Sequence, residues 1–129
     1  MSETFLVDTN AAISYINGDE KIRALFDKTQ TLFTSVIVLG ELYFGAENSQ
    51  HSESNMAQIE GFIAEITVLT CNLETAKHYG HIYQKLKAVG RPIPVNDIWI
   101  AATAIQHDLT LISRDHHFQA VAGLTVQNW

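Results

Sequence analysis

The sequence is poor in cysteine: Cys71 is the only one in 129 residues. A single thiol excludes an internal disulfide framework and fits a protein of a reducing compartment. No histidine-bearing nucleophile signature surrounds Cys71, so we expect it to be a small buried hydrophobic residue and not a catalytic thiol.

Long apolar runs, repeats and linkers are also missing. No apolar stretch approaches the 18 residues of a membrane span, and the opening MSETFLVDTN has neither the basic stretch nor the cleavage site of a signal peptide. We therefore expect a cytoplasmic protein without a membrane segment. Because no low-complexity or Pro- or Gly-rich linker interrupts the chain, residues 1–129 are expected to form a single domain.

Positive charge is scarce as well. Eight Lys and Arg stand against 14 Asp and Glu, which gives a formal charge of −6. This sign argues against binding nucleic acid by bulk electrostatics. If four of the acids formed one cation-binding cluster, the remaining formal charge would be only −2, which weakens that objection.

Hydrophobic patterning predicts an α/β fold. Short apolar runs with the character of buried parallel strands are found at residues 5–7, 31–34, 66–69, 109–112 and 124–126. Segments with helical spacing separate them, with Asn10, Ser35 and Asn72 as expected N-caps, and the polar stretch 48–55 is expected to be a loop. The alternation indicates a three-layer α/β/α sandwich with a central parallel sheet.

Two acids follow predicted strands. Asp8 comes directly after the first, and Asp115 comes three residues after the strand that ends at Ile112. Ligands bind beyond the carboxyl ends of the strands in open parallel sheets, so these acids are expected to share one rim although they are far apart in sequence.

Two further acids lie on apolar helices. Glu41 stands in VIVLGELYFG, which is apolar on nearly every side, so we expect a buried helix and a carboxylate that is protonated, ion-paired or metal-bound. Asp97 lies in the first turn of PVNDIWIAA, where capping of backbone amides would be a sufficient explanation. Both a capping and a site role stay open for Asp97 at this point.

Four converging carboxylates would need protons or cations. Two of them about 4 Å apart repel by roughly 4 kcal/mol at an effective dielectric of 20. Arg114 is the sequence neighbour expected to neutralise part of this charge, and oxygen ligands favour Mg²⁺ or Mn²⁺ for the rest. Such a site is suited to hydrolysis of a phosphodiester bond by metal-activated water.

These motifs together resemble a known family. An apolar run ending in Asp-Thr-Asn, Glu41 in an apolar helix, NDIWIAA at 96–102 and SRDHHF at 113–118 are similar, in order and spacing along the whole chain, to the PIN domain and specifically to VapC toxins of toxin-antitoxin pairs.

The resemblance implies a Mg²⁺- or Mn²⁺-dependent endoribonuclease that is held inactive by a VapB-like antitoxin and commonly forms homodimers. Carried over by position, the catalytic and metal-binding acids are Asp8, Glu41, Asp97 and Asp115. Asn10 and Ser113 match the supporting polar residues, and Ser113 departs from a frequent threonine while keeping the hydroxyl.

Basic and aromatic residues are weaker candidates. Lys77, Lys85 and Arg91 belong to the only basic concentration and are candidate RNA contacts, although a solvated helix face partly satisfied by Glu74 explains them as well. His78 and His81 are interpreted as structural or surface residues. His116 and His117 adjoin a proposed ligand, and a proton-shuttle role for His116 is considered but has no support in the sequence. Trp99 is expected in the core.

Two other functions are considered. In a phosphotransfer domain Asp8 would be phosphorylated, but Asn10 and Arg114 occupy places where that chemistry usually needs an aspartate and a lysine. A catalytically silent PIN-like module that binds RNA or protein is the second alternative, and the presence of all four acids argues against it.

Overall fold

The computed structural model describes residues 4–28 and 31–129. Within these ranges five strands form one sheet, in the order β3-β2-β1-β4-β5, and every pairing is parallel. The strands are β1 (Thr4–Val7), β2 (Thr31–Ser35), β3 (Thr67–Leu69), β4 (Thr110–Ile112) and β5 (Val126–Gln127). The predicted parallel sheet is confirmed, with its last strand beginning two residues later than expected.

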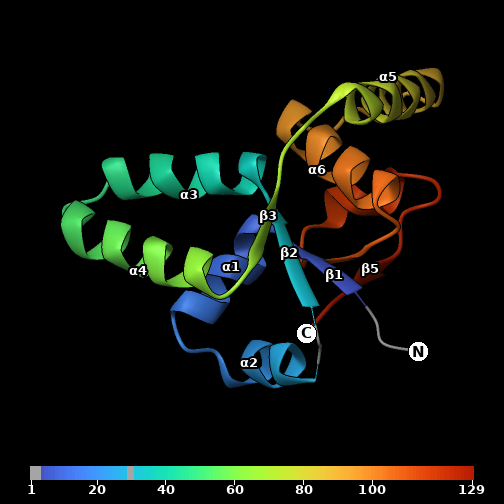
Figure 1. Cartoon of the computed structure of the whole chain (residues 1–129). Coiled ribbons are helices and arrows are strands. Elements are labelled where there is room, and N and C mark those ends of the chain that lie inside the picture. The colour runs from blue at the N-terminus through green and yellow to red at the C-terminus, as the bar shows by residue number, and fades with distance from the viewer. Residues whose placement is uncertain (1–3, 29–30) are drawn as a thin grey trace.

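Six α-helices and one short 3₁₀ helix connect the strands in the described part of the chain. They are α1 (Thr9–Ile16), α2 (Glu20–Asp27), α3 (Val36–Glu47), α4 (Ser52–Ala64), α5 (Leu73–Ala88), α6 (Val95–Gln106) and η1 (His116–Ala120). The chain runs from β1 through β2 to β3 and then returns to β4 on the other side of β1. Because crossovers are right-handed, this reversal places α1 to α4 on one face and α5 and α6 on the other, as Figure 1 shows. The three-layer sandwich is confirmed.

The core lies between the sheet and these two helical layers. In β1, Phe5, Leu6 and Val7 are all buried, and so are Leu111 and Ile112 in neighbouring β4. Helix α6 is buried along most of its length. None of the helices in the described ranges is both long and apolar enough to cross a membrane.

Helix starts agree with the sequence in two of three cases. Ser35 caps α3 by accepting the Ile37 amide at 2.9 Å, and Asn72 forms a capping box with Thr75. Asn10 is not an N-cap, contrary to the prediction. Helix α1 begins one residue after Asp8, whose extended backbone makes the turn out of the strand, and Asn10 therefore lies in the first helical turn.

Two local predictions are wrong. Polar composition does not exclude a helix at residues 52–55, and the apolar character of cysteine does not guarantee that Cys71 is buried. Residues 52–55 belong to α4, so the loop is shorter than 48–55, and Ser54 Oγ donates to the His51 carbonyl in the first turn of that helix. The Asn55 side chain donates to Ser49 Oγ across the connection. Cys71 is exposed and not buried, because it follows β3 at the edge of the sheet.

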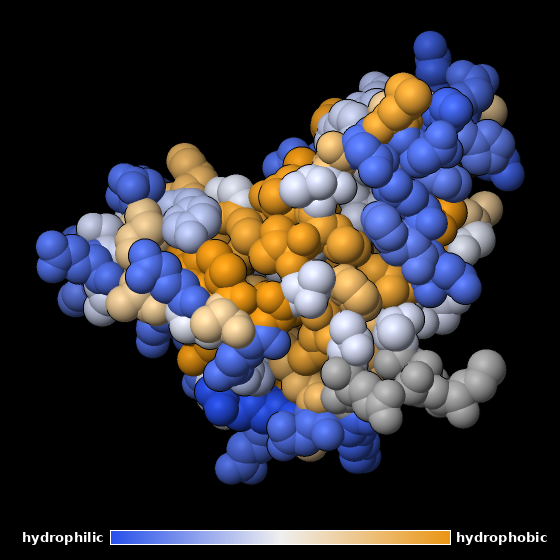
Figure 2. All heavy atoms as spheres, in the orientation of Figure 1, coloured by the Kyte–Doolittle hydropathy of each residue, from blue (hydrophilic) through white to orange (hydrophobic). Residues whose placement is uncertain are grey.

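Helix α3 is buried on one side only. Val38, Leu42 and Ala46 face the core, whereas Val36 is 37% and Phe44 is 72% exposed. Figure 1 shows α3 and α4 side by side, projecting beyond the sheet, and no element of the described ranges covers the side of α3 that carries Phe44. Hydrophobic residues gather on the surface between this pair and α5–α6 (Figure 2). The expectation of a helix buried all round is therefore wrong.

Candidate active site

The site lies at the carboxyl ends of the neighbouring strands β1 and β4. Between these two strands the order in which the chain adds strands to the sheet changes direction. The Asp8 amide donates to the Ile112 carbonyl at 3.1 Å, and Ser113 Oγ donates to Asp8 Oδ2 at 2.6 Å. Asp8 is 4% exposed and Ser113 is also buried. The predicted rim therefore exists, and adjacent parallel strands bring its two ends together.

Helix α3 brings Glu41 to this rim. Its carboxylate is half-buried and accepts a 2.9 Å hydrogen bond from Thr9 Oγ1 at the start of α1. Thr9 was not among the residues predicted to serve the site. Its position directly after Asp8, at a strand-to-helix turn, was the available signal.

Asp97 and Asp115 meet through a histidine. Asp97 lies in the first turn of α6 and is 8% exposed, and its Oδ2 is 3.0 Å from His117 Nδ1. The same nitrogen is 3.0 Å from Asp115 Oδ1, which also accepts the His117 backbone amide at 2.9 Å as the N-cap of η1. The histidine inside the site is thus His117, whereas His116 is exposed.

Arg114 does not neutralise the acids, contrary to the sequence interpretation. Its guanidinium lies 4.1 Å from the ring centroid of Trp129 and donates to Asn128 Oδ1 and the Trp129 carbonyl. The Arg114 backbone amide instead contacts Asn10 Oδ1, at 3.5 Å. Asn10 therefore borders the segment that carries Asp115, in agreement with a supporting position.

Burial and the charge of neighbouring acids disfavour the ionised form of Asp8, Glu41 and Asp97. Burial raises the pKa of Asp8 to about 6, against hydrogen bonds from Ser113 and Thr9, and the charges of Asp97 and Glu41 add to the rise. Burial also raises the pKa values of Glu41 and Asp97, and the charge of Asp115 contributes to both. Pro94 is the N-cap of α6, and the Asp97 carboxylate contacts His117, so capping alone does not account for Asp97.

The donor atoms fit a divalent cation. Asp97, Asp115 and His117 each offer one ligand atom, and these three atoms lie within 4.8 Å of one another. Carboxylate oxygens suit hard ions such as Mg²⁺ and Mn²⁺, and a cation would relieve the opposed ionisation of Asp8 and Glu41 beside them.

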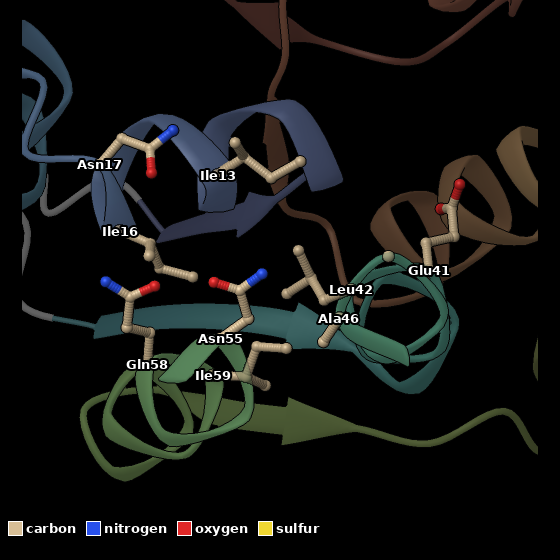
Figure 3. Close-up of a pocket in the computed structure, with 10 residues that line it drawn as sticks. Ile13, Ile16, Asn17, Glu41, Leu42, Ala46, Asn55, Gln58 and Ile59 are labelled. Atoms are coloured by element: carbon tan, nitrogen blue, oxygen red, sulfur yellow. The ribbon is translucent and has the colours of Figure 1, made fainter. Parts of the chain in front are cut away.

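Two hollows border Glu41. One of about 200 Å³ lies between α1, α3 and α4, and Figure 3 shows its lining with the Glu41 carboxylate directed away from the other labelled side chains. The second, of about 540 Å³, lies between Thr9, the exposed side of α3 and Asn96. The acids are therefore approachable from the open side of α3.

Lys77 and Lys85, two of the three basic candidates, line neither of the hollows beside Glu41. Lys77 Nζ is 3.2 Å from Glu74 Oε1 in an exposed pair, which supports the solvated-face interpretation. Lys85 lines a separate hollow with His78 and His81. Trp99 is half-buried and stacks on Tyr79 at 4.1 Å between ring centroids, so its packing role is confirmed while complete burial is not.

Comparison with known proteins agrees with this geometry. The sequence matches the PIN domain family over residues 5–124. It is 36% identical to Ribonuclease VapC2 of Haemophilus influenzae and 37% identical to the tRNA(fMet)-specific endonuclease VapC of Shigella flexneri, in each case over 97% of both chains. A chain in the crystal structure of DNA-bound VapBC from Salmonella typhimurium superposes with a TM-score of 0.92 at 34% identity, covering 100% of this chain and 99% of that one. With the acids, the sheet order and these matches in agreement, the chain belongs to the PIN-domain family and, within it, to the VapC ribonucleases.

Proposed function

We propose that the protein is the toxin of a type II toxin-antitoxin system and acts as an endoribonuclease that depends on Mg²⁺ or Mn²⁺. One observation carries the proposal: four acids from separate segments converge at the carboxyl ends of β1 and β4, and burial raises the pKa of three of them, Asp8, Glu41 and Asp97. The names of the Haemophilus and Shigella relatives support nuclease activity. A complete acidic set favours an enzyme over a silent binding module, and membership of this family removes the reason to consider a phosphotransfer domain.

In this proposal Asp8, Glu41, Asp97 and Asp115 hold the metal. A bound ion would stabilise charge on the phosphate and lower the pKa of an attacking water. Ser113 fixes the orientation of Asp8, and Thr9 fixes that of Glu41, through the hydrogen bonds at 2.6 and 2.9 Å.

The surroundings of the acids suit a phosphodiester. The amino end of α6 carries Asn96 at the larger hollow, and a helix amino terminus favours a phosphate group. Lys85 and Arg91 are retained as proposed RNA contacts, whereas the ion pair with Glu74 leaves Lys77 the weakest of the three.

Metal dependence tests the proposed activity. Purified, antitoxin-free protein should cleave total RNA supplemented with tRNA(fMet) in Mg²⁺ or Mn²⁺, and EDTA should lower the rate by at least about 100-fold, because the acids alone cannot stabilise phosphate charge. Excess Mn²⁺ should restore it. Gel analysis of end-labelled RNA measures the rate, and cleavage that EDTA leaves unchanged would contradict the proposal.

We further propose that a VapB-like antitoxin binds the smaller hollow. Ile13 and Ile16 of α1, Leu42 of α3 and Ile59 of α4 line it, and Glu41 lies at its edge (Figure 3). An apolar segment seated there would lie beside the approach to the acids, and a basic side chain that extends past the edge of the hollow would pair with Glu41. The structural relative from Salmonella is a VapBC complex, which supports a partner of this kind.

We also propose a homodimer formed by the outer side of α3. Val36 and Phe44 are exposed there, and Val95 at the start of α6 is 48% exposed. Figure 2 shows hydrophobic residues gathered on the surface next to the α3–α4 pair. Residues 36–46 carry no basic residue, so a second copy is a better occupant than RNA for the apolar end of the larger hollow at Val36 and Phe44, whereas the phosphate belongs to its polar end at Glu41 and Asn96.

Two substitutions separate the proposed partners, and each is the control for the other. Ile13→Asp should weaken antitoxin binding at least about 10-fold and leave the dimer, because it places a charge in the smaller hollow. Phe44→Asp should yield a monomer that still binds antitoxin. Both side chains are exposed, at 45% and 72%, so the fold should tolerate the changes. Light scattering after size exclusion, with titration of antitoxin, measures both effects; loss of both interactions in both variants would contradict the assignment.

A further inference from the structure

His117 is placed between two of the acids in a way that the proposed acidic metal site does not require. We propose that His117 is a direct nitrogen ligand of the ion held by Asp97 and Asp115, and that this nitrogen makes the site select Mn²⁺ over Mg²⁺. The inference rests on the proposed function for the position of the metal, and it adds a ligand and an ion preference.

The distances match one coordination sphere. Nδ1 is 3.0 Å from Asp97 Oδ2 and 3.0 Å from Asp115 Oδ1. Adjacent ligands of an octahedral ion with bonds of about 2.1 Å are separated by about 3.0 Å. The imidazole and both carboxylates can therefore serve one ion with little movement of their side chains.

The fold holds this histidine in place from two sides. On one side, Asp115 caps η1 through the His117 amide, and Phe118, the next residue, is 1% exposed and anchors the turn in the core. On the other side, Asp97 belongs to α6, which packs against both β4 and η1. The side chain of His117 is nevertheless 35% exposed, which leaves an open side for water or a phosphate oxygen.

A mixed nitrogen and oxygen donor set distinguishes between the two ions. Mg²⁺ takes oxygen ligands almost exclusively and keeps several waters, whereas imidazole is a ligand of transition-series ions. Mn²⁺ accepts carboxylates and water as Mg²⁺ does and, as a transition-series ion, also accepts imidazole nitrogen. The predicted preference is therefore for Mn²⁺. A site made of oxygen ligands alone would discriminate little between Mn²⁺ and Mg²⁺.

Pulsed electron paramagnetic resonance on protein loaded with half an equivalent of Mn²⁺ tests the proposed bond. The wild type should show the hyperfine coupling of a directly bound ¹⁴N nucleus. His117→Asn should lose that coupling, because the amide keeps an N–H donor near the position of Nδ1 but has no nitrogen lone pair. His116→Asn, at the exposed neighbour, should keep it, and Asp97→Asn should lose the bound ion.

Competition binding gives a second readout. The ratio of Mn²⁺ to Mg²⁺ affinity should fall about 10-fold in His117→Asn, while the Mg²⁺ affinity changes less than about 3-fold. Isotope labelling extends the resonance test. In wild-type protein that contains ¹⁵N-histidine, a ¹⁵N hyperfine coupling should appear in place of the ¹⁴N coupling. This comparison needs no substitution and therefore no assumption about folding.

Absence of the nitrogen coupling from the wild type, or its persistence in His117→Asn, would overturn the inference and leave His117 as a hydrogen-bonding residue. RNA cleavage without that coupling would leave the proposed function intact. The coupling without any RNA cleavage would contradict the nuclease proposal and support the metal ligand, so the two failures are distinguishable.

Discussion

Asp8→Asn should lower the rate of RNA cleavage by at least about 10³-fold, equivalent to about 4 kcal/mol of transition-state stabilisation. Asp8 is the most buried of the four acids, and its orientation is fixed by Ser113 at 2.6 Å. Asparagine keeps the size and the hydrogen-bonding capacity but removes the negative charge that the proposed metal site needs. Initial rates on end-labelled RNA in saturating Mn²⁺ measure the effect.

The matched control is Asp108→Asn. Asp108 is exposed, and its positive φ of 55° is a conformation that asparagine adopts readily. This variant loses the same charge at the amino end of β4, away from the carboxyl ends where the four acids converge, and should cleave RNA at the wild-type rate. Loss of activity in both variants, or in neither, would contradict a specific role for Asp8.

The same Asp8→Asn substitution should stabilise the metal-free protein at pH 7.5 by about 2 to 3 kcal/mol. Burial raises the pKa of Asp8 from 3.8 to about 6, so ionisation of this carboxyl at neutral pH opposes folding. A shift of about two units corresponds to about 3 kcal/mol, and the amide has no charge to desolvate. Urea unfolding in EDTA measures the free energy of unfolding of both proteins.

The pH dependence follows from the direction of this shift. Because the folded-state pKa is raised, the contribution of Asp8 to wild-type stability is fully present below about pH 3.8 and is lost as the pH rises through about 6. The advantage of the Asp8→Asn protein should therefore grow across this window and level off above it. Saturating Mn²⁺ should reduce the advantage, because a bound ion stabilises the folded wild type. Wild-type protein that is more stable than the variant in EDTA at pH 7.5 would contradict the assigned shift.

The sequence predicts the sheet and the position of the rim because both follow from local pattern and general topology. Apolar runs of strand length, separated by helices, specify parallel strands, and the carboxyl ends of such strands bring Asp8 and Ser113 together. The sequence leaves two roles open for Asp97, and the structure distinguishes it from a capping residue, because Pro94 is the N-cap of α6 and the Asp97 carboxylate contacts His117.

Side-chain direction could not be predicted in the same way. Arg114 and His117 both neighbour Asp115 in sequence, yet the guanidinium turns to Trp129 and the imidazole turns into the site. A short 3₁₀ helix decides this, and its single turn has no periodic pattern to reveal it. For α3, apolar composition indicates that its surface needs covering but not whether the same chain or a partner provides the cover.

The most direct test of the metal-dependent nuclease is hydrolysis of RNA by wild-type and Asp8→Asn proteins that are purified in parallel, free of antitoxin, with Mn²⁺ present and with EDTA in its place. We predict cleavage by the wild type with Mn²⁺ alone, and none above background in the other three reactions. Equal residual cleavage by the two proteins would show a contaminating nuclease and contradict the assignment of activity to the acids at the ends of β1 and β4.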